Sequence, residues 1–75
     1  MFDQQKFATR LKEARIARKL SQEELGKAIG MSKPAISDIE RGRRTTTIEK
    51  LVELADVLEV SLDYLTGRTD ERGPG

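Results

Sequence analysis

Two helix-start signals lie close together in residues 21–42, with a glycine between them. Ser21 is followed three residues later by Glu24, the spacing of a capping box, in which each side chain binds a backbone N–H of the other residue. Gly30 then offers the left-handed backbone conformation that closes a helix at little cost. Ser32 supplies a second cap, and Pro34 falls in the first turn of the next helix, where a missing N–H is tolerated. We therefore predict two short helices joined by a tight turn.

The second of these helices is predicted to separate a buried face from a displayed one. Ile36 and Ile39 lie at helical spacing and form its buried stripe, and Gly42 ends it. Four residues face away from that stripe: Lys33, Pro34, Ser37 and Asp38. This helix follows a tight inter-helix turn, is held by its buried face and exposes the residues of its N-terminal end. That arrangement is typical of a helix-turn-helix that enters the DNA major groove.

The rest of the chain also shows helical spacing, and no strand-like alternation is present. A first helix is predicted from about Asp3 to Arg18, a fourth after a cap at Thr46 or Thr47, and a fifth after Ser61. The expected apolar faces are Phe7, Leu11 and Ala14; Leu25, Ala28 and Ile29; Ile48, Leu51, Val52, Ala55 and Leu58; Leu62, Tyr64 and Leu65. The predicted fold is all-α, a compact five-helix domain over residues 1–66. Residues 67–75 are charged, contain Gly and Pro, and are predicted to form a flexible tail.

Composition narrows the functional classes. The chain has no cysteine and no histidine, so disulfides, the usual zinc sites and the commonest catalytic bases and nucleophiles are absent. We expect no cofactor, no metal and no enzyme activity. No apolar run has membrane-spanning length and no signal-peptide pattern is present, so we expect a soluble cytoplasmic protein without a membrane partner.

Charge is unevenly distributed although the net charge is only +1. Residues 1–20 carry +4 and residues 33–44 carry +2, whereas residues 45–66 carry −4. A basic half and an acidic half suggest one face for phosphates and another turned from the DNA. An ordinary mixed surface would give the same pattern, so charge alone does not decide between the two.

Four sequence blocks resemble the phage-repressor-type, Cro-like helix-turn-helix family, also called the xenobiotic-response-element family. The blocks are Leu20-Ser-Gln-Glu-Glu-Leu, Ile29-Gly-Met-Ser, Ala35-Ile-Ser-Asp-Ile-Glu-Arg-Gly and Val60-Ser-Leu-Asp-Tyr-Leu. The resemblance runs from about Phe7 to Thr66. It implies a five-helix domain that binds double-stranded operator DNA, usually as a symmetric homodimer.

On the displayed helix, four residues are predicted to face the bases. Lys33 can donate to guanine O6 or N7, or can bind a phosphate. Ser37 can donate or accept at a base edge, or can simply face solvent. Asp38 can accept from cytosine N4, repel phosphates, or pair with a neighbouring cation. Pro34 can contact a thymine methyl, although starting the helix is the simpler role for it.

Phosphate contacts are predicted around this helix. The resemblance implies a phosphate clamp at Gln22, at the N-terminus of the preceding helix, where backbone N–H groups also attract anions. Ser32 can combine capping with a phosphate contact. Arg43 and Arg44 lie in the loop expected to follow the DNA backbone. A charge run of this kind is usually only solvated, but the position of the loop after the displayed helix favours phosphate contact for this pair.

Two further predictions concern structure and assembly. The resemblance implies a buried ion pair between Arg15 and Glu40 beneath the motif. Relatives in this family often dimerise through the C-terminal region, which places Tyr64 and Leu65 in a predicted homodimer interface. Core closure is the simpler role for this region and is favoured for Leu62 and Leu65, so Tyr64 is the main interface candidate.

A sequence-specific repressor is the function that we predict, with a near-palindromic operator read by a dimer. The competing interpretation is a protein-interaction module of the same fold, such as an antitoxin subunit or a coactivator. In that case the acidic fourth and fifth helices would bind an unidentified protein partner.

Overall fold

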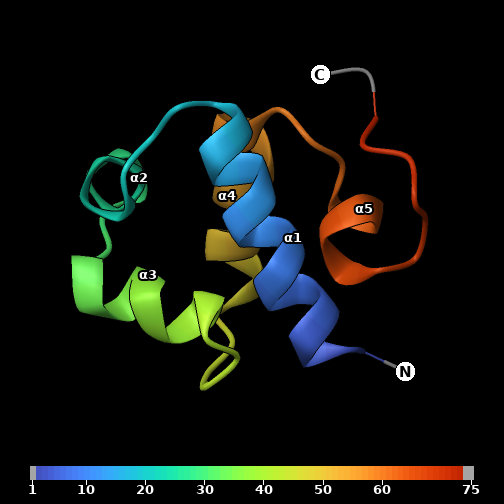
Figure 1. The fold of residues 1–75 in the computed structure, drawn as a ribbon, viewed down its shortest axis with the longest axis horizontal. Helices are drawn as coiled ribbons and strands as arrows, with labels where there is room; N and C mark the ends of the chain where they lie inside the picture. Colours follow the sequence, from blue (N-terminus) through green and yellow to red (C-terminus); the bar gives the residue numbers. More distant parts are fainter. Residues whose placement is uncertain (1, 74–75) are drawn as a thin grey trace.

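The computed structural model describes residues 2–73 and contains five helices and no strand within that range (Figure 1). The helices are α1 (Gln4–Ala17), α2 (Gln22–Ile29), α3 (Lys33–Glu40), α4 (Ile48–Leu58) and α5 (Leu62–Thr66). The all-α prediction is confirmed. Met1, Pro74 and Gly75 lie outside the described residues, so the two ends of the predicted domain and tail are described only in part.

Every helix begins at a polar cap whose side-chain oxygen accepts a backbone N–H from the first turn. These caps are Asp3, Ser21, Ser32, Thr47 and Ser61. Ser21 and Glu24 form the predicted capping box reciprocally. Of the two candidates for the start of α4, Thr47 is the cap, with its hydroxyl accepting from Lys50 N at 3.2 Å. The element boundaries therefore follow from short-range signals in the sequence.

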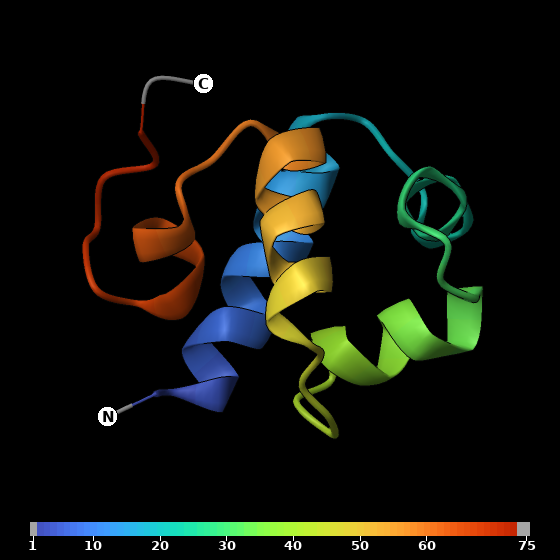
Figure 2. The same ribbon diagram turned by 180° about the vertical axis from the view of Figure 1, so that it is seen from behind.

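The helices are arranged around α1. In Figure 1, α2 and α3 lie to its left and α5 to its right, and Figure 2 shows the same arrangement from behind. Helix α1 packs against both α3 and α5, and α4 contacts α2 and α5. One continuous apolar core fills the centre, with seven large side chains fully buried: Phe7, Leu11, Leu25, Ile36, Ile39, Leu54 and Leu65. This core joins the α2–α3 pair to the rest of the domain.

Three predicted apolar faces were partly wrong. On α5, Leu62 is 37% exposed, while Tyr64 and Leu65 are buried. On α4, Ile48 is 72% exposed and Val52 is 40% exposed, while the core side chain is Leu54, at 0%. This helix carries apolar residues on more than one face, and its contacts with α2 and α5 select the stripe of Leu54, Ala55 and Leu58. On α2, Ala28 is exposed, and Leu25 and Ile29 are buried as expected.

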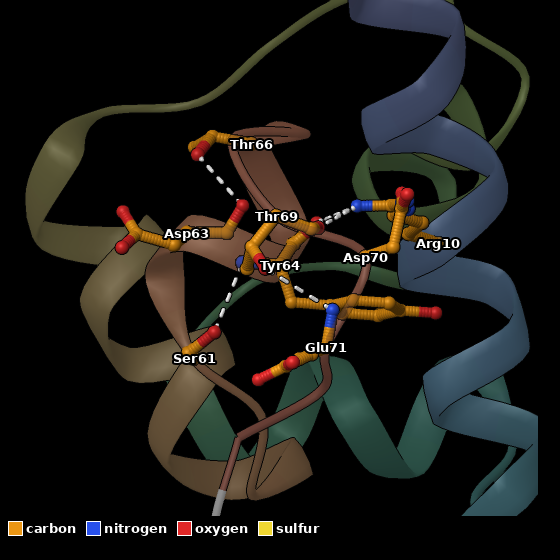
Figure 3. Close-up of polar contacts among 8 residues, drawn as sticks. All are labelled: Arg10, Ser61, Asp63, Tyr64, Thr66, Thr69, Asp70 and Glu71. Atoms are coloured by element: carbon orange, nitrogen blue, oxygen red, sulfur yellow. Dashed lines mark hydrogen bonds and ion pairs between the residues drawn. The ribbon is translucent and has the colours of Figure 1, made fainter.

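Residues 67–73, in the predicted tail, make polar contacts with α1 and with the cap of α5 (Figure 3). The guanidinium of Arg10 on α1 donates to the Tyr64 carbonyl at 2.7 Å and the Thr69 carbonyl at 2.6 Å, and pairs with Asp70 at 2.5 Å. The Ser61 N–H donates to the Arg72 carbonyl at 2.7 Å. The tail lacks an apolar anchor, as predicted, but Arg10 supplies a polar one.

Candidate nucleic-acid interface

The turn between α2 and α3 depends on two glycines. Gly30 ends α2 with a φ of +72°, in the left-handed region predicted for it. Gly26 is required for a different reason, because a Cβ there would lie 2.3 Å from the Met31 carbonyl oxygen. The Met31 N–H donates to the Gly26 carbonyl at 2.8 Å, so the turn closes back onto the helix that precedes it. Sequence reasoning missed Gly26, although an isolated glycine inside a helical pattern is a recognised sign of close packing.

Helix α3 has the two faces that its sequence predicts. Ile36 and Ile39 are fully buried, and Ser32 caps the helix by accepting from Ala35 N at 3.2 Å. The four side chains proposed to face bases lie off this stripe. Lys33 and Pro34 are exposed, and Ser37 and Asp38 are half-buried. The structure therefore gathers all four on the part of α3 that the core does not use.

Arg15 and Glu40 form an ion pair that fastens the end of α3 to α1. Arg15 Nε donates to Glu40 Oε2 at 2.6 Å and Nη2 donates to Oε1 at 3.0 Å, with the two side chains 12% and 3% exposed. Arg15 Nη1 also donates to the Leu20 carbonyl at 2.8 Å. The hydrogen bond to Glu40 raises the pKa of Arg15 above its ordinary value. Both side chains are thus held in one geometry.

Gln22 joins this network, which links the start of α2 to the end of α3. Its Nε2 donates to Glu40 Oε1 at 3.1 Å. An amide nitrogen carries two protons, so the same group can donate a second bond outward, next to the N-terminal N–H groups of α2. The Arg15–Glu40 ion pair therefore holds the Gln22 side chain at the predicted phosphate position.

Lys50 on α4 holds the turn from the other side, a role that sequence reasoning did not assign. Its Nζ donates to the Ile29 carbonyl, at the C-terminal end of α2, at 2.5 Å and lies 3.1 Å from Glu53. A cation at this end of a helix satisfies a free carbonyl and complements the helix dipole. The sequence did not indicate this contact, because Lys50 lies in the first turn of α4 and is 21 residues away from Ile29.

The loop after α3 displays the two arginines that were predicted to bind phosphate. Gly42 has a φ of +74°, and Arg43 and Arg44 are exposed. The Gly42 N–H donates to the Ile39 carbonyl at 3.0 Å and the Arg43 N–H donates to the Asp38 carbonyl at 2.9 Å. Both arginines therefore follow α3 directly, on a loop whose start is hydrogen-bonded to the helix.

Leu65 closes the core, which was its favoured role, and Tyr64, the main candidate for the dimer interface, is buried with it. Tyr64 is 6% exposed and Leu65 is 0% exposed, because both pack into the core of their own chain. The Tyr64 ring also lies beneath the guanidinium of Arg10, 4.4 Å from the ring centroid. The exposed apolar side chains of this region are instead Ile48, Val52 and Leu62.

Residues 2–73 were searched for metal-binding clusters and for membrane-spanning helices. No group of three or more acidic side chains in that range is placed to hold a metal ion. None of the five helices there is long and apolar enough to cross a bilayer.

Comparison with known proteins assigns the chain to a family. A family model described as helix-turn-helix matches residues 11–65. The chain belongs to the helix-turn-helix family. Its relatives in this family include the cryptic phage CTXphi transcriptional repressor RstR of Vibrio cholerae, 40% identical over 88% of this chain, and the uncharacterised HTH-type transcriptional regulator YobD of Bacillus subtilis, 37% identical over 91%. This chain covers 61% of each of those two proteins.

Solved structures of this helix-turn-helix family have the same fold. The P22 c2 repressor, solved in complex with a synthetic operator, is 37% identical with a TM-score of 0.76, covering 79% of this chain and 89% of its own. The restriction-modification controller protein C.AhdI from Aeromonas hydrophila is 35% identical with a TM-score of 0.77, covering 84% and 91%. The relatives are named as regulators, which agrees with the prediction that this chain is not an enzyme.

Proposed function

We propose that this chain is a sequence-specific DNA-binding repressor that places α3 in the major groove of an operator. The observation that carries the proposal is the division of α3, in which two fully buried isoleucines anchor the helix and four polar or small side chains lie off the core. A helix held in this way can be inserted as a rigid unit. The similarity to the P22 c2 repressor, which was solved in complex with a synthetic operator, supports DNA binding by this fold.

The four displayed residues of α3 would supply base contacts. The exposed ammonium of Lys33 can donate to guanine O6 or N7, and the Ser37 hydroxyl can donate or accept. Asp38 can accept from cytosine N4 and disfavour other bases by repulsion. Pro34 can offer apolar contact to a thymine methyl while starting the helix.

Phosphate contacts would come from residues around α3. The second N–H of the Gln22 amide and the first N–H groups of α2 form one donor cluster. The Ser32 hydroxyl accepts from Ala35 N, and its own proton can be donated to a phosphate. Arg43 and Arg44 extend from the loop after α3. These contacts would set the register of the protein on the duplex.

The proposed repressor would bind a near-palindromic operator as a homodimer. Two α3 helices must enter grooves one helical turn apart, about 34–36 Å. With Tyr64 and Leu65 buried, we place the dimer contact at the exposed apolar residues of α4 and α5: Ile48, Val52 and Leu62. Val52→Glu would then make the protein monomeric in sedimentation, while Ile16→Glu, at an exposed apolar site on α1, would not.

Selection of binding sites from a random DNA pool at stated salt tests the function directly. An inverted repeat with half-site centres about 10 bp apart would support a dimeric operator-binding repressor. A single enriched half-site would retain sequence-specific binding and exclude the symmetric dimer. Absence of enrichment, with only weak salt-sensitive binding, would overturn the proposal.

The two loop arginines separate DNA binding from the competing interpretation as a protein-interaction module. One solved relative in this fold is a SinR–SinI protein complex, 33% identical with a TM-score of 0.72. Arg43→Ala with Arg44→Ala should weaken DNA binding and reduce the slope of log K against log salt by about 1 for each phosphate that the variant no longer neutralises. Arg68→Ala is the matched control, because that exposed arginine pairs with Asp63 beside α5. Protein binding through α4 and α5 should stay intact in the arginine variant, and unchanged DNA binding in that variant would favour the interaction module.

A further inference from the structure

The N-terminal turn of α1 is bonded to the loop that carries the two exposed arginines, although 38 residues separate the bonded groups. Gln4 Nε2 donates to the Gly42 carbonyl oxygen at 2.8 Å. The side chain of Gln5 lies over the same glycine, since a Cβ at Gly42 would fall 2.4 Å from Gln5 Nε2. The first turn of α1 therefore covers the point at which the chain leaves α3.

This bond acts on one particular peptide unit. The carbonyl of Gly42 and the N–H of Arg43 belong to the same planar peptide group. The N–H end donates to the Asp38 carbonyl at 2.9 Å, and the carbonyl end accepts from Gln4 at 2.8 Å. Both ends of the plane are thus held, one by α3 and the other by α1. The Cα of Arg43 lies in the same plane, so its position is fixed together with the peptide group.

Without the Gln4 bond, this peptide would be held at one end only. Gly42, with a φ of +74°, has the conformational freedom of a residue without a Cβ, so its own backbone does little to restrict the plane. Ordering a flexible loop on binding costs affinity, and a loop ordered beforehand avoids that cost. Gln4 is neutral, so it adds no charge that would attract DNA by itself.

We propose that Gln4 is a positioning residue for DNA-backbone binding, which fixes the Gly42–Arg43 peptide and so holds the loop of Arg43 and Arg44 ready for phosphate contact. The inference rests on the proposed function, because it assumes that these two arginines bind phosphate. A merely structural bond would change the stability of the domain and leave the arginine contacts alone. The two roles therefore predict different results in DNA binding.

A double-mutant cycle distinguishes them. Gln4→Met removes the donor at nearly constant size, and Thr9→Val, at an exposed position further along α1, is the control. Each of the two substitutions is made in two backgrounds, one with both arginines intact and one carrying Arg43→Ala with Arg44→Ala. The affinity of each protein for the selected operator is then measured across a salt series. Neutral hydrogen bonds are typically worth a factor between about 2 and 10 in an equilibrium. We expect Gln4→Met to weaken binding by about that factor, to reduce the salt slope and to leave the preferred base sequence unchanged.

The decisive result is the dependence on the arginines. The effect of Gln4→Met should disappear when both arginines are absent, because residues that act through one another are not additive. Equal losses in the two backgrounds, or a loss with an unchanged salt slope, would overturn the inference alone. If the arginine substitutions themselves leave binding unchanged, the proposed phosphate contacts fail and the inference fails with them.

Hydrogen exchange supplies a second readout that does not depend on DNA. The amide of Arg43 should exchange several-fold faster in Gln4→Met than in the wild type, with the amides inside α3 unchanged. Circular dichroism confirms that the variant is folded. If Gln4→Met does not fold, Gln4→Asn, whose amide is one methylene too short to reach Gly42, is measured in its place. Unchanged exchange at Arg43 would show that α3 alone holds the loop and would overturn the inference.

Discussion

Glu40→Ala is expected to destabilise the domain by about 3–5 kcal/mol, the usual cost of breaking a buried ion pair. The Glu40 carboxylate is 3% exposed and accepts three hydrogen bonds, two from Arg15 and one from Gln22. Removing it leaves the guanidinium of Arg15, only 12% exposed, without its counter-charge. The loss therefore comes from a stranded cation as well as from the missing bonds.

A loss of this size is easy to detect in a chain of 75 residues. Globular domains are stable by about 0.05–0.15 kcal/mol per residue, which gives about 4–11 kcal/mol for this length. Urea unfolding followed by circular dichroism should show the Glu40→Ala midpoint far below that of the wild type. Glu53→Ala is the control, because that half-exposed carboxylate pairs with Lys50 on the surface of α4, and it should cost less than about 0.5 kcal/mol.

Two measurements test whether the Arg15–Glu40 pair behaves as a buried pair. A loss below about 1 kcal/mol for Glu40→Ala would mean that water replaces the carboxylate and that the pair behaves as a surface pair. Arg15→Met together with Glu40→Leu should recover most of the loss, because an apolar pair of similar volume needs no counter-charge. If the double variant were less stable than Glu40→Ala, the stranded-charge explanation would be refuted.

Three further predictions test other parts of the fold. Lys50→Met should cost about 1 kcal/mol in chemical denaturation, because the carbonyl at the end of α2 loses its donor; an unchanged midpoint would contradict this role. In the monomeric chain, Leu54→Ala should cost about 2–5 kcal/mol and Ile48→Ala less than about 0.5 kcal/mol, and the reverse order would refute the observed orientation of α4. Hydrogen bonds from Ser21 lower the pKa of Glu24, so the stability due to its charged form is present above the ordinary glutamate pKa and is lost as pH falls through the lowered one. An NMR titration should show this low pKa, and Ser21→Ala should raise it only part of the way, because the backbone N–H of residue 21, the larger cause, still donates to Glu24.

The local features of this fold could be predicted because their signals are short-range. Ser21 with Glu24, Gly30, and Ser32 with Pro34 each act within one or two turns of the chain, and all take the predicted positions. The same holds for the buried stripe of α3, since two isoleucines at helical spacing leave one face for the core. These signals define the α2–α3 pair and the set of side chains that α3 displays.

Features that depend on distant contacts could not be predicted in the same way. Helix α4 has apolar residues on more than one face, and only its packing against α2 and α5 buries Leu54 and exposes Ile48. Arg10 holds residues 60 positions away, and its side chain gave no sign that it would anchor the tail. Tyr64 was predicted to face a second copy, but Arg10 and the tail enclose it.

The division of α3 between Ile36 and Ile39 on one face and its displayed side chains on the other has an evolutionary consequence. Surface substitutions away from caps and buried networks usually change stability by no more than about 0.5 kcal/mol. Lys33 and Ser37 can therefore drift through many residue types while the domain stays folded. A library randomised at these two positions should yield mostly folded proteins, whose DNA preferences differ from one member to the next. In such a molecule, binding specificity can evolve faster than the fold that carries it.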